Sequence, residues 1–330
     1  MKMSVLLAVL ALVPPSFAEI SPSGDTTGKI DYAAIAAAVA QGGTVELGEG
    51  TFYVNHQIEL TSAVTLKGAG RDVTIVKQVL SHTAVNKNAR LFTLDNANAV
   101  LADLTVSDGY VYDTAKEGAG VRITSNGGMV RDCRITNCET SMNSGGALSV
   151  NGGTVTRTII DANFNAHAYG GTAGVTISAG TMDNCLIVNN KLSGSECSAR
   201  AYPVAGGVYL SGTALLRNCT IAGNHGRVVG GVNFSDGWGW RTGKLVNCVI
   251  AGNTASEMSS AITQSYDADI NVNWNCNVKT TDRFEKCLFG DGVVLPNYTC
   301  VGVVPISRPK ATIISLQVRR RLAWPTMRTG

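Results

Sequence analysis

Two short motifs in the middle of the chain combine a histidine with a second functional side chain. His167 is followed by Tyr169, and His225 is followed by Arg227, in each case shortly before a pair of glycines. A histidine can take up a proton near neutral pH, and an arginine binds a carboxylate group. The four residues are therefore candidate catalytic residues for proton abstraction beside the carboxylate of an acidic sugar. The alternative is that they belong to solvated loops.

Acidic residues form a second candidate site. Asp108, Asp113 and Glu117 follow one another closely, and Glu139 lies about one repeat later. Carboxylate oxygens are the ligands that calcium prefers, so these four residues are candidate ligands of a Ca²⁺ cofactor if the protein is a lyase. The alternative is again a set of solvated loop residues.

Charged and aromatic residues also gather in two irregular segments, where they could contact a sugar chain. Aromatic rings stack on sugar rings, and arginine pairs with acidic groups. The alternative for the tryptophan-containing segment is that it folds onto its neighbours. The candidate substrate-binding residues are Glu196, Arg200, Tyr202, Trp238, Trp240 and Arg241.

A repeat determines how these segments are arranged. Its best-conserved part within the chain is a five-residue motif with Cys or Thr at its third position, and the successive third positions lie 25, 27, 34 and 29 residues apart. The third positions are Cys133, Thr158, Cys185, Cys219 and Cys248. Five residues after each of the last four stands an asparagine (Asn163, Asn190, Asn224 and Asn253), whereas the first copy has Cys138 there.

Glycine-rich pairs precede each motif and lead into alternating apolar residues, such as Val208-Tyr209-Leu210. This alternation is typical of short β-strands. A repeat of 25 to 30 residues without a helical crossover predicts coils whose strands pair in parallel with the next copy. We therefore expect an all-β fold, a single-stranded right-handed parallel β-helix.

Stacked coils predict that equivalent residues form columns. The asparagines should bond to one another at a turn, and the cysteines should line the interior together with Thr158. Three states remain open for the cysteines: stacked free thiols, disulfides between adjacent coils, or a metal site. A single file of thiols does not offer tetrahedral ligands.

The N-terminal part predicts the start of this solenoid. Asp31 is placed to cap a short helix over 33–40 that would cover the open end of the first coil. Strands are expected over 44–47, 57–60 and 64–66. The variable segments between the asparagines and the glycine pairs should all emerge along one flank, where any site would lie.

The opening residues carry a family resemblance. Gly-Gly-Thr-Val-Glu-Leu-Gly-Glu-Gly-Thr-Phe at 42–52 and Val-Thr-Leu-Lys-Gly-Ala-Gly at 64–70 resemble the start of pectate-lyase-like right-handed parallel β-helix proteins. The Gly-Gly-Ala-Leu and Cys-x-Ile repeats resemble those of polymorphic outer-membrane proteins and autotransporter passengers. This resemblance spans about residues 30–290, and it implies the fold and a carbohydrate-contacting or adhesive role.

Composition and charge indicate the segments of the chain and the kinds of partner it has. Residues 1–18 have the pattern of a signal peptide, 19–306 form the β-helix domain, and 307–330 are a basic tail expected to be disordered or atypical. Without signal and tail, acidic residues outnumber basic ones, so a nucleic-acid partner is not indicated. We expect a secreted or cell-surface monomer, without an integral membrane segment, that contacts polysaccharide or a surface glycan.

Two functions follow as hypotheses. The first is a lyase or hydrolase of uronate-containing polymers. The second is a non-catalytic, adhesin-like surface solenoid, because the acidic motifs typical of β-helix polygalacturonases are missing from the sequence.

Overall fold

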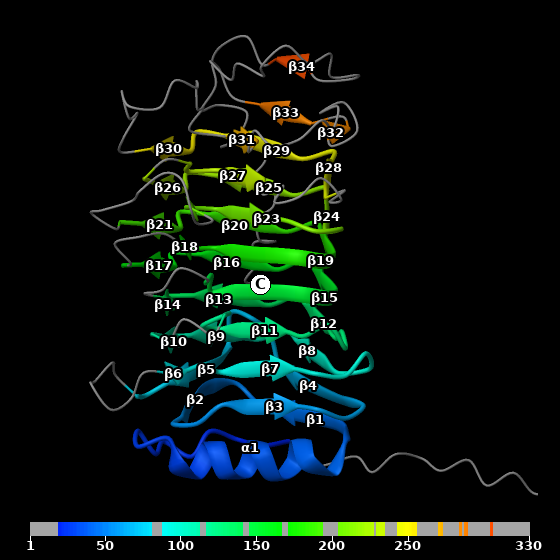
Figure 1. The fold of residues 1–330 in the computed structure, drawn as a ribbon. Helices are drawn as coiled ribbons and strands as arrows, with labels where there is room; N and C mark the ends of the chain where they lie inside the picture. The colour runs from blue at the N-terminus through cyan, green and yellow to red at the C-terminus, as the bar shows by residue number, and fades with distance from the viewer. Residues whose placement is uncertain are drawn as a thin grey trace, which may run out of the picture.

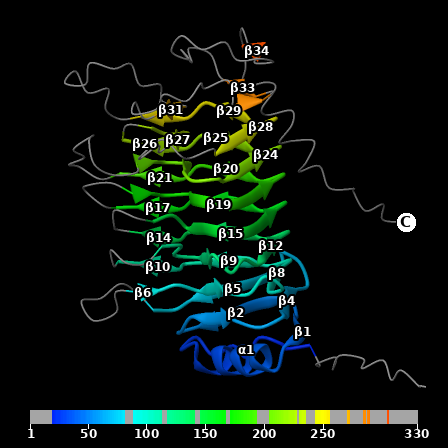
Figure 2. The same cartoon turned by 45° about the vertical axis from the view of Figure 1, so that its right-hand side comes forward.

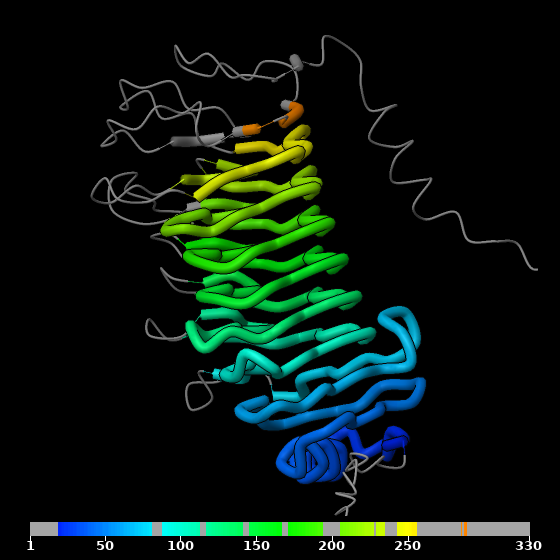
Figure 3. Tube along the Cα trace, turned by 90° about the vertical axis from the view of Figure 1, so that its right-hand side faces the viewer, coloured from blue at the N-terminus to red at the C-terminus, as the bar shows by residue number. Residues whose placement is uncertain are grey.

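Parallel pairing between successive coils organises the chain (Figure 1). The computed structural model describes residues 19–80, 88–112, 117–140, 145–166, 171–193, 204–227, 229–234, 243–255, 270–272, 284–285, 287–289 and 304–305. Each coil runs through three sheets, here called A, B and C, and then returns to sheet A at the next level. Figure 3 shows the successive coils stacked one above the other. The fold is the right-handed parallel β-helix that the repeats predicted.

Sheet A forms the widest face and consists of two rows of strands. The first row contains β3 (Ile58–Leu60), β7 (Phe92–Leu94), β11 (Val121–Ile123), β15 (Leu148–Thr156), β19 (Val175–Asp183), β23 (Val208–Leu210), β27 (Val232–Phe234) and β31 (Ile270–Val272). The second contains β1 (Gly43–Leu47), β4 (Val64–Gly68), β8 (Val100–Ala102), β12 (Met129–Arg131), β24 (Leu215–Arg217), β28 (Lys244–Val246) and β32 (Phe284–Glu285). The long strands β15 and β19 span both rows.

Sheet B forms the next face of each coil. Its strands are β2 (Gly50–Val54), β5 (Thr74–Gln78), β9 (Thr105–Ser107), β13 (Arg134–Thr136), β16 (Ile159–Asp161), β20 (Leu186–Val188), β25 (Thr220–Ala222), β29 (Val249–Ala251), β33 (Leu288–Phe289) and β34 (Val304–Pro305). Each strand pairs in parallel with its neighbours in this order.

Sheet C is made of two-residue strands that form a narrow column (Figure 2). They are β6 (Asn88–Ala89), β10 (Tyr110–Val111), β14 (Glu139–Thr140), β17 (Phe164–Asn165), β21 (Lys191–Leu192), β26 (His225–Gly226) and β30 (Thr254–Ala255). A separate pair, β18 (Gly171–Thr172) and β22 (Val204–Ala205), lies between sheets C and A along the chain. Segments 113–116, 141–144, 167–170 and 194–203 each follow a sheet C strand, so their attachment points form one column, whereas segment 235–242 follows β27 of sheet A.

Helix α1 (Lys29–Gln41) lies under the first coil and covers it with Ile35 and Val39 (Figure 1). The expected cap residue, Asp31, lies inside the helix instead. Its buried carboxylate accepts hydrogen bonds from the backbone N–H groups of Ser23 and Tyr53, both at 2.8 Å, and so attaches the helix to β2. The carboxylate of Asp25 accepts hydrogen bonds from the backbone N–H groups of Lys29 and Ile30 in the first turn of the helix, both at 3.0 Å. These bonds stabilise the ionised carboxylate and lower the pKa of Asp25 to about 2.

The asparagine column predicted from the repeats is confirmed. The side-chain Nδ2 of Asn163 donates to Oδ1 of Asn190, that of Asn190 to Asn224, and that of Asn224 to Asn253, each at 2.9 Å. Each Nδ2 also donates to the carbonyl of an isoleucine in the preceding coil, and each Oδ1 also accepts a backbone N–H. The buried amides are thus satisfied from coil to coil, as burial requires.

The cysteine column is also confirmed, and Cys287 extends it by one coil. Each thiol lies inside the solenoid and donates to carbonyl groups of its own coil and of the coil below. The described cysteines are all free thiols. Burial raises the pKa of Cys133 and of Cys138 to about 12, so both thiols stay protonated at neutral pH.

Tight corners separate the sheets, and from Asp103 to Gly252 the corners contain a residue in the left-handed conformation. Between sheets A and B these residues have φ of 48–56°, and between B and C they have φ of 53–69°. The first corner contains Asp103, Asp132, Arg157, Asn184, Asn218 and Asn247, and the second contains Asp108, Asn137, Ala162, Asn189, Gly223 and Gly252. Asn, Asp and Gly tolerate this conformation, whereas arginine and alanine are strained in it.

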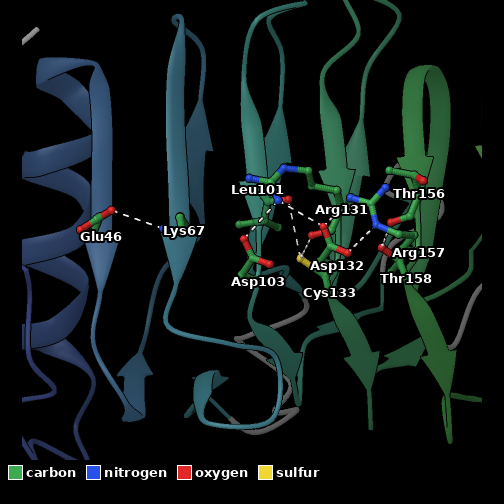
Figure 4. A network of polar contacts seen from close by, with 10 residues as sticks. All are labelled: Glu46, Lys67, Leu101, Asp103, Arg131, Asp132, Cys133, Thr156, Arg157 and Thr158. Carbon is green, nitrogen blue, oxygen red and sulfur yellow. Dashed lines mark hydrogen bonds and ion pairs between the residues drawn. The ribbon is translucent and has the colours of Figure 1, made fainter. Parts of the chain in front are cut away.

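Ion pairs connect the corners of neighbouring coils. Arg131 lies between Asp103 and Asp132, at 3.2 and 3.1 Å, and Arg157 of the next coil reaches Asp132 at 2.6 Å (Figure 4). These pairs lie at the surface, and each contributes little to stability on its own. They align adjacent coils at the corner where the chain passes from sheet A to sheet B.

Removing one rung of the asparagine column should be strongly destabilising. In Asn190→Ala, the carbonyl of Ile160 and the amides of Asn163 lose their buried partner, so we expect a loss of about 3 kcal/mol or more in the free energy of unfolding. Chemical denaturation followed by circular dichroism measures it. The control is Asn189→Gly at the exposed left-handed corner, which should change stability by less than about 0.5 kcal/mol. Equal effects of the two variants would contradict the role of the column.

Ala162 offers a stabilising change. Its side chain is exposed and its φ is 54°, whereas the equivalent corner residues Gly223 and Gly252 carry no Cβ. We expect Ala162→Gly to stabilise the protein by about 1 kcal/mol, because the left-handed strain is relieved without loss of packing. The control is Ala222→Gly at the end of strand β25, where glycine should destabilise the protein instead. A thermal unfolding series that gives both changes the same sign would refute this explanation.

Candidate functional site

A polar column runs along the outer face of the first row of sheet A. The inward residues of these strands are apolar and buried, as with Val121 and Ile123 of β11, while the residue between them faces outward. In-register pairing stacks one such residue per coil, at a spacing of about 4.8 Å. The members are Glu59, Thr93, Arg122, Ser149, Thr176, Tyr209 and Asn233.

Two arginines lie together on this face. Arg90 follows β6 and is only 5% exposed, and its guanidinium donates to the carbonyl oxygens of Glu117 at 2.6 Å and Gly118 at 2.9 Å. Burial and, second, the positive charge of Arg122 lower the pKa of Arg90 to about 10, against the opposite effect of Glu117 and Glu59. Arg90 therefore remains charged at neutral pH and is held rigidly by backbone groups.

Three carboxylates lie near the arginines. Glu117 accepts a hydrogen bond from Ser149 at 2.9 Å, and Glu59 accepts one from the side chain of Gln57 at 2.7 Å. Asp95 accepts bonds from Thr124 and Asn126 that stabilise its ionised form and lower its pKa. We call Glu59, Arg90, Asp95, Glu117 and Arg122 the charged cluster.

The charged cluster is suited to an acidic, hydroxyl-rich ligand. A guanidinium group binds a carboxylate through two parallel hydrogen bonds, and Nε of Arg122 is buried without a hydrogen-bond partner among the described residues. The carboxylates can accept bonds from hydroxyl groups or exchange protons. Beyond the cluster, the polar column contains Thr93, Ser149, Thr176 and Asn233, which are buried, and Tyr209, which is half-buried.

The structure places two of the four predicted catalytic residues. His225 lies on β26 with Nδ1 at 2.8 Å from Oγ1 of Thr254, and Arg227 follows that strand. His167 and Tyr169 lie outside the described residues, so their role stays a prediction. His225 faces outward from sheet C in the column that also contains Glu139, Phe164 and Lys191.

The predicted calcium ligands lie at separate places where they are described. Asp108 is at the corner before β10 and pairs with Lys77 at 3.6 Å, whereas Glu117 follows β10 and bonds Ser149. Glu139 is exposed on β14, and Asp113 lies outside the described residues. Within the described ranges, no three His, Cys, Asp or Glu side chains are placed to hold a metal ion. The calcium site therefore stays a prediction that depends on Asp113.

The six predicted substrate-binding residues, Glu196, Arg200, Tyr202, Trp238, Trp240 and Arg241, all lie outside the described residues. Their flanking strands are described. Segment 194–203 connects β21 of sheet C with β22, next to the first row of sheet A, and segment 235–242 connects β27 with β28. Both segments are therefore attached beside strands of the face that carries the polar column.

Four members of the charged cluster were not predicted as site residues from the sequence. Glu59 and Arg122 each stand between two apolar residues of a strand, so alternation alone could have placed them on an outer face. Arg90 and Asp95 carry no such signal. They reach the cluster because successive coils bring residues about 30 positions apart in the chain into contact.

Comparison with known proteins agrees on the fold alone. No family model and no curated protein matches the chain. Similar solved structures include a pectin methylesterase from carrot (14% identity, TM-score 0.34, covering 72% of this chain and 83% of that one). Others are the AlgE4 A-module, a mannuronan C-5 epimerase of Azotobacter vinelandii (16%, 0.31, 83% of each chain), and a mannuronic acid-specific polysaccharide family 6 lyase from human gut microbiota (12%, 0.24, 92% and 94%).

These similarities are too weak to carry an argument about function. The pectate-lyase-like β-helix expected from the opening residues is confirmed as a fold by the strand pairing itself. The described part of the chain also contains no helix that is long and apolar enough to cross a membrane.

The hydrogen bonds to Asp95 give a direct test of the cluster's geometry. We expect Thr124→Val to raise the pKa of Asp95 toward its ordinary value, because the ionised carboxylate loses the first of its stabilising bonds. Carboxyl-carbon NMR titration measures the change. Thr136→Val on β13, in sheet B, should leave the Asp95 titration unaltered. An unchanged pKa in Thr124→Val would show that this bond is absent in solution.

Proposed function

We propose that this protein is an exported β-helix that binds a uronate-containing polysaccharide across the charged cluster and cleaves it as a lyase or hydrolase. The observation that carries this proposal is the pair Arg90 and Arg122, placed beside three carboxylates on the polar outer face of sheet A. Export is inferred from the signal-peptide pattern of residues 1–18.

The arrangement supports recognition through the sugar carboxylate. Arg122 has the unused donor, while Arg90 is held by the backbone carbonyls of Glu117 and Gly118 and adds positive charge nearby. A sugar chain laid along the solenoid axis would meet exposed Glu59 and half-buried Arg122 and Tyr209, because the other members of the polar column are buried.

The same contact would assist cleavage by elimination. A guanidinium bound to the uronate carboxylate stabilises the negative charge that develops when a base removes the proton from the adjacent ring carbon. The bond to the leaving oxygen then breaks, and the product sugar is unsaturated. Glu59, Asp95 and Glu117 are carboxylates on the correct face to exchange protons in such a reaction.

A non-catalytic, adhesin-like solenoid is the second candidate. It is favoured by the pairing of Glu117 with Ser149 and of Asp95 with Thr124 and Asn126, which leaves these carboxylates engaged in structural bonds. Polysaccharide binding is common to both candidates, and product formation distinguishes them.

Substitution of Arg122 tests the proposal. We expect Arg122→Gln to weaken binding to polyuronates at least about tenfold, since one charge-assisted contact contributes about 1.5–3 kcal/mol. Binding to polygalacturonate and alginate is measured by calorimetry, and cleavage by ultraviolet absorbance of unsaturated ends and by new reducing ends, with and without calcium. The matched control is Arg134→Gln on the outer face of sheet B, which should bind like the unsubstituted protein.

The outcomes separate the candidates. Binding that depends on Arg122 without any product supports the non-catalytic solenoid, and binding with product supports the enzyme. Failure to bind either polymer, or equal binding by the Arg122 and Arg134 variants, overturns the proposal.

A further inference from the structure

The interior contains four consecutive thiols in a single file. Cys185, Cys219, Cys248 and Cys287 each directly precede a strand of sheet B, and those strands pair in register. The backbone N–H groups of Thr220, Val249 and Leu288 donate to the carbonyls of Cys185, Cys219 and Cys248, at 3.0, 2.9 and 2.8 Å. The four cysteines therefore stack directly one above the other inside the solenoid.

The spacing of the coils is compatible with cross-linking. Equivalent Cα atoms of stacked strands lie about 4.8 Å apart, within the range of about 4.4–6.8 Å found across disulfides. Cys133 is different, because Thr158 stands between it and Cys185 in the column. The file of contiguous thiols thus begins at Cys185 and has an even number of described members.

We propose that oxidation converts this file into two interior cross-links between adjacent coils, Cys185–Cys219 and Cys248–Cys287. In each step the two thiols lose two electrons and two protons as the sulfur–sulfur bond forms. A disulfide oxidant such as glutathione disulfide takes them up and is reduced to two thiols. This pairing uses all four cysteines, whereas a bond between Cys219 and Cys248 would leave two thiols without a neighbour.

Burial determines when the reaction occurs. The four side chains are at most 3% exposed, so a dissolved oxidant cannot reach them in the closed solenoid. The cross-links form while the coils are still closing, and they are afterwards protected from reductants. The device is independent of polysaccharide binding, because it faces the interior and the charged cluster faces outward.

Production of the full chain under two redox conditions tests the proposal. The protein is exported to an oxidising compartment, or made in a reducing cytosol, and free thiols are alkylated in denaturant before unreduced peptide mapping. We expect the two predicted linkages only in the exported protein. Its midpoint temperature of unfolding should exceed that of the reduced protein by at least about 5 °C.

Threonine variants supply the controls, because Thr158 shows that threonine fits this column. Cys219→Thr should abolish the first linkage and retain the second, and Cys248→Thr should do the reverse. Cys133→Thr should retain both. Four alkylated thiols in the exported protein, or linkage of these cysteines to Cys197, Cys276 or Cys300, overturns the proposal, and the peptide map of the unsubstituted protein decides this even if a variant fails to fold.

Discussion

In-register parallel stacking is the constraint on which the rest of the structure depends. Each residue of a coil lies about 4.8 Å from its equivalent in the next coil. A side chain therefore has the equivalent side chains of the neighbouring coils directly above and below it. A buried polar side chain is then satisfied by its neighbours in the column and by the backbone of the adjacent coils. Asn163, Asn190, Asn224 and Asn253 meet this condition, because an amide both donates and accepts and can repeat indefinitely.

The corners show how stacking overrides local preference. Most corner positions contain Asn, Asp or Gly, which adopt the left-handed conformation at little cost. Arg157 adopts it as well, at φ 48°, and its guanidinium reaches Asp132 of the preceding coil at 2.6 Å. Ala162 gains no such contact, so its conformation is imposed by the coils above and below. The path of the chain is therefore set by the stack as a whole.

The same constraint separates structure from function. Inward positions keep a similar residue in most coils, because packing and hydrogen bonding constrain them, although Thr158 replaces a cysteine in its column. Outward positions are free to vary, and on the first row of sheet A they change from Glu59 to Arg122 to Tyr209. The charged cluster lies in the coils that combine variable outward residues with the buried side chain of Arg90. A repeating scaffold thus carries a local, non-repeating site.

The sequence by itself determined the architecture, because period, alternation and the Asn and Cys columns are properties of one repeating unit. It also placed Glu117 in a polar segment beside the eventual site. It did not reveal that Asp31 would bond to Ser23 and Tyr53 rather than cap its own helix. Nor did it reveal that Arg90 would approach Glu117, since the register between coils of unequal length decides which residues meet. Only the tertiary structure sets that register, because it results from the packing of all coils together.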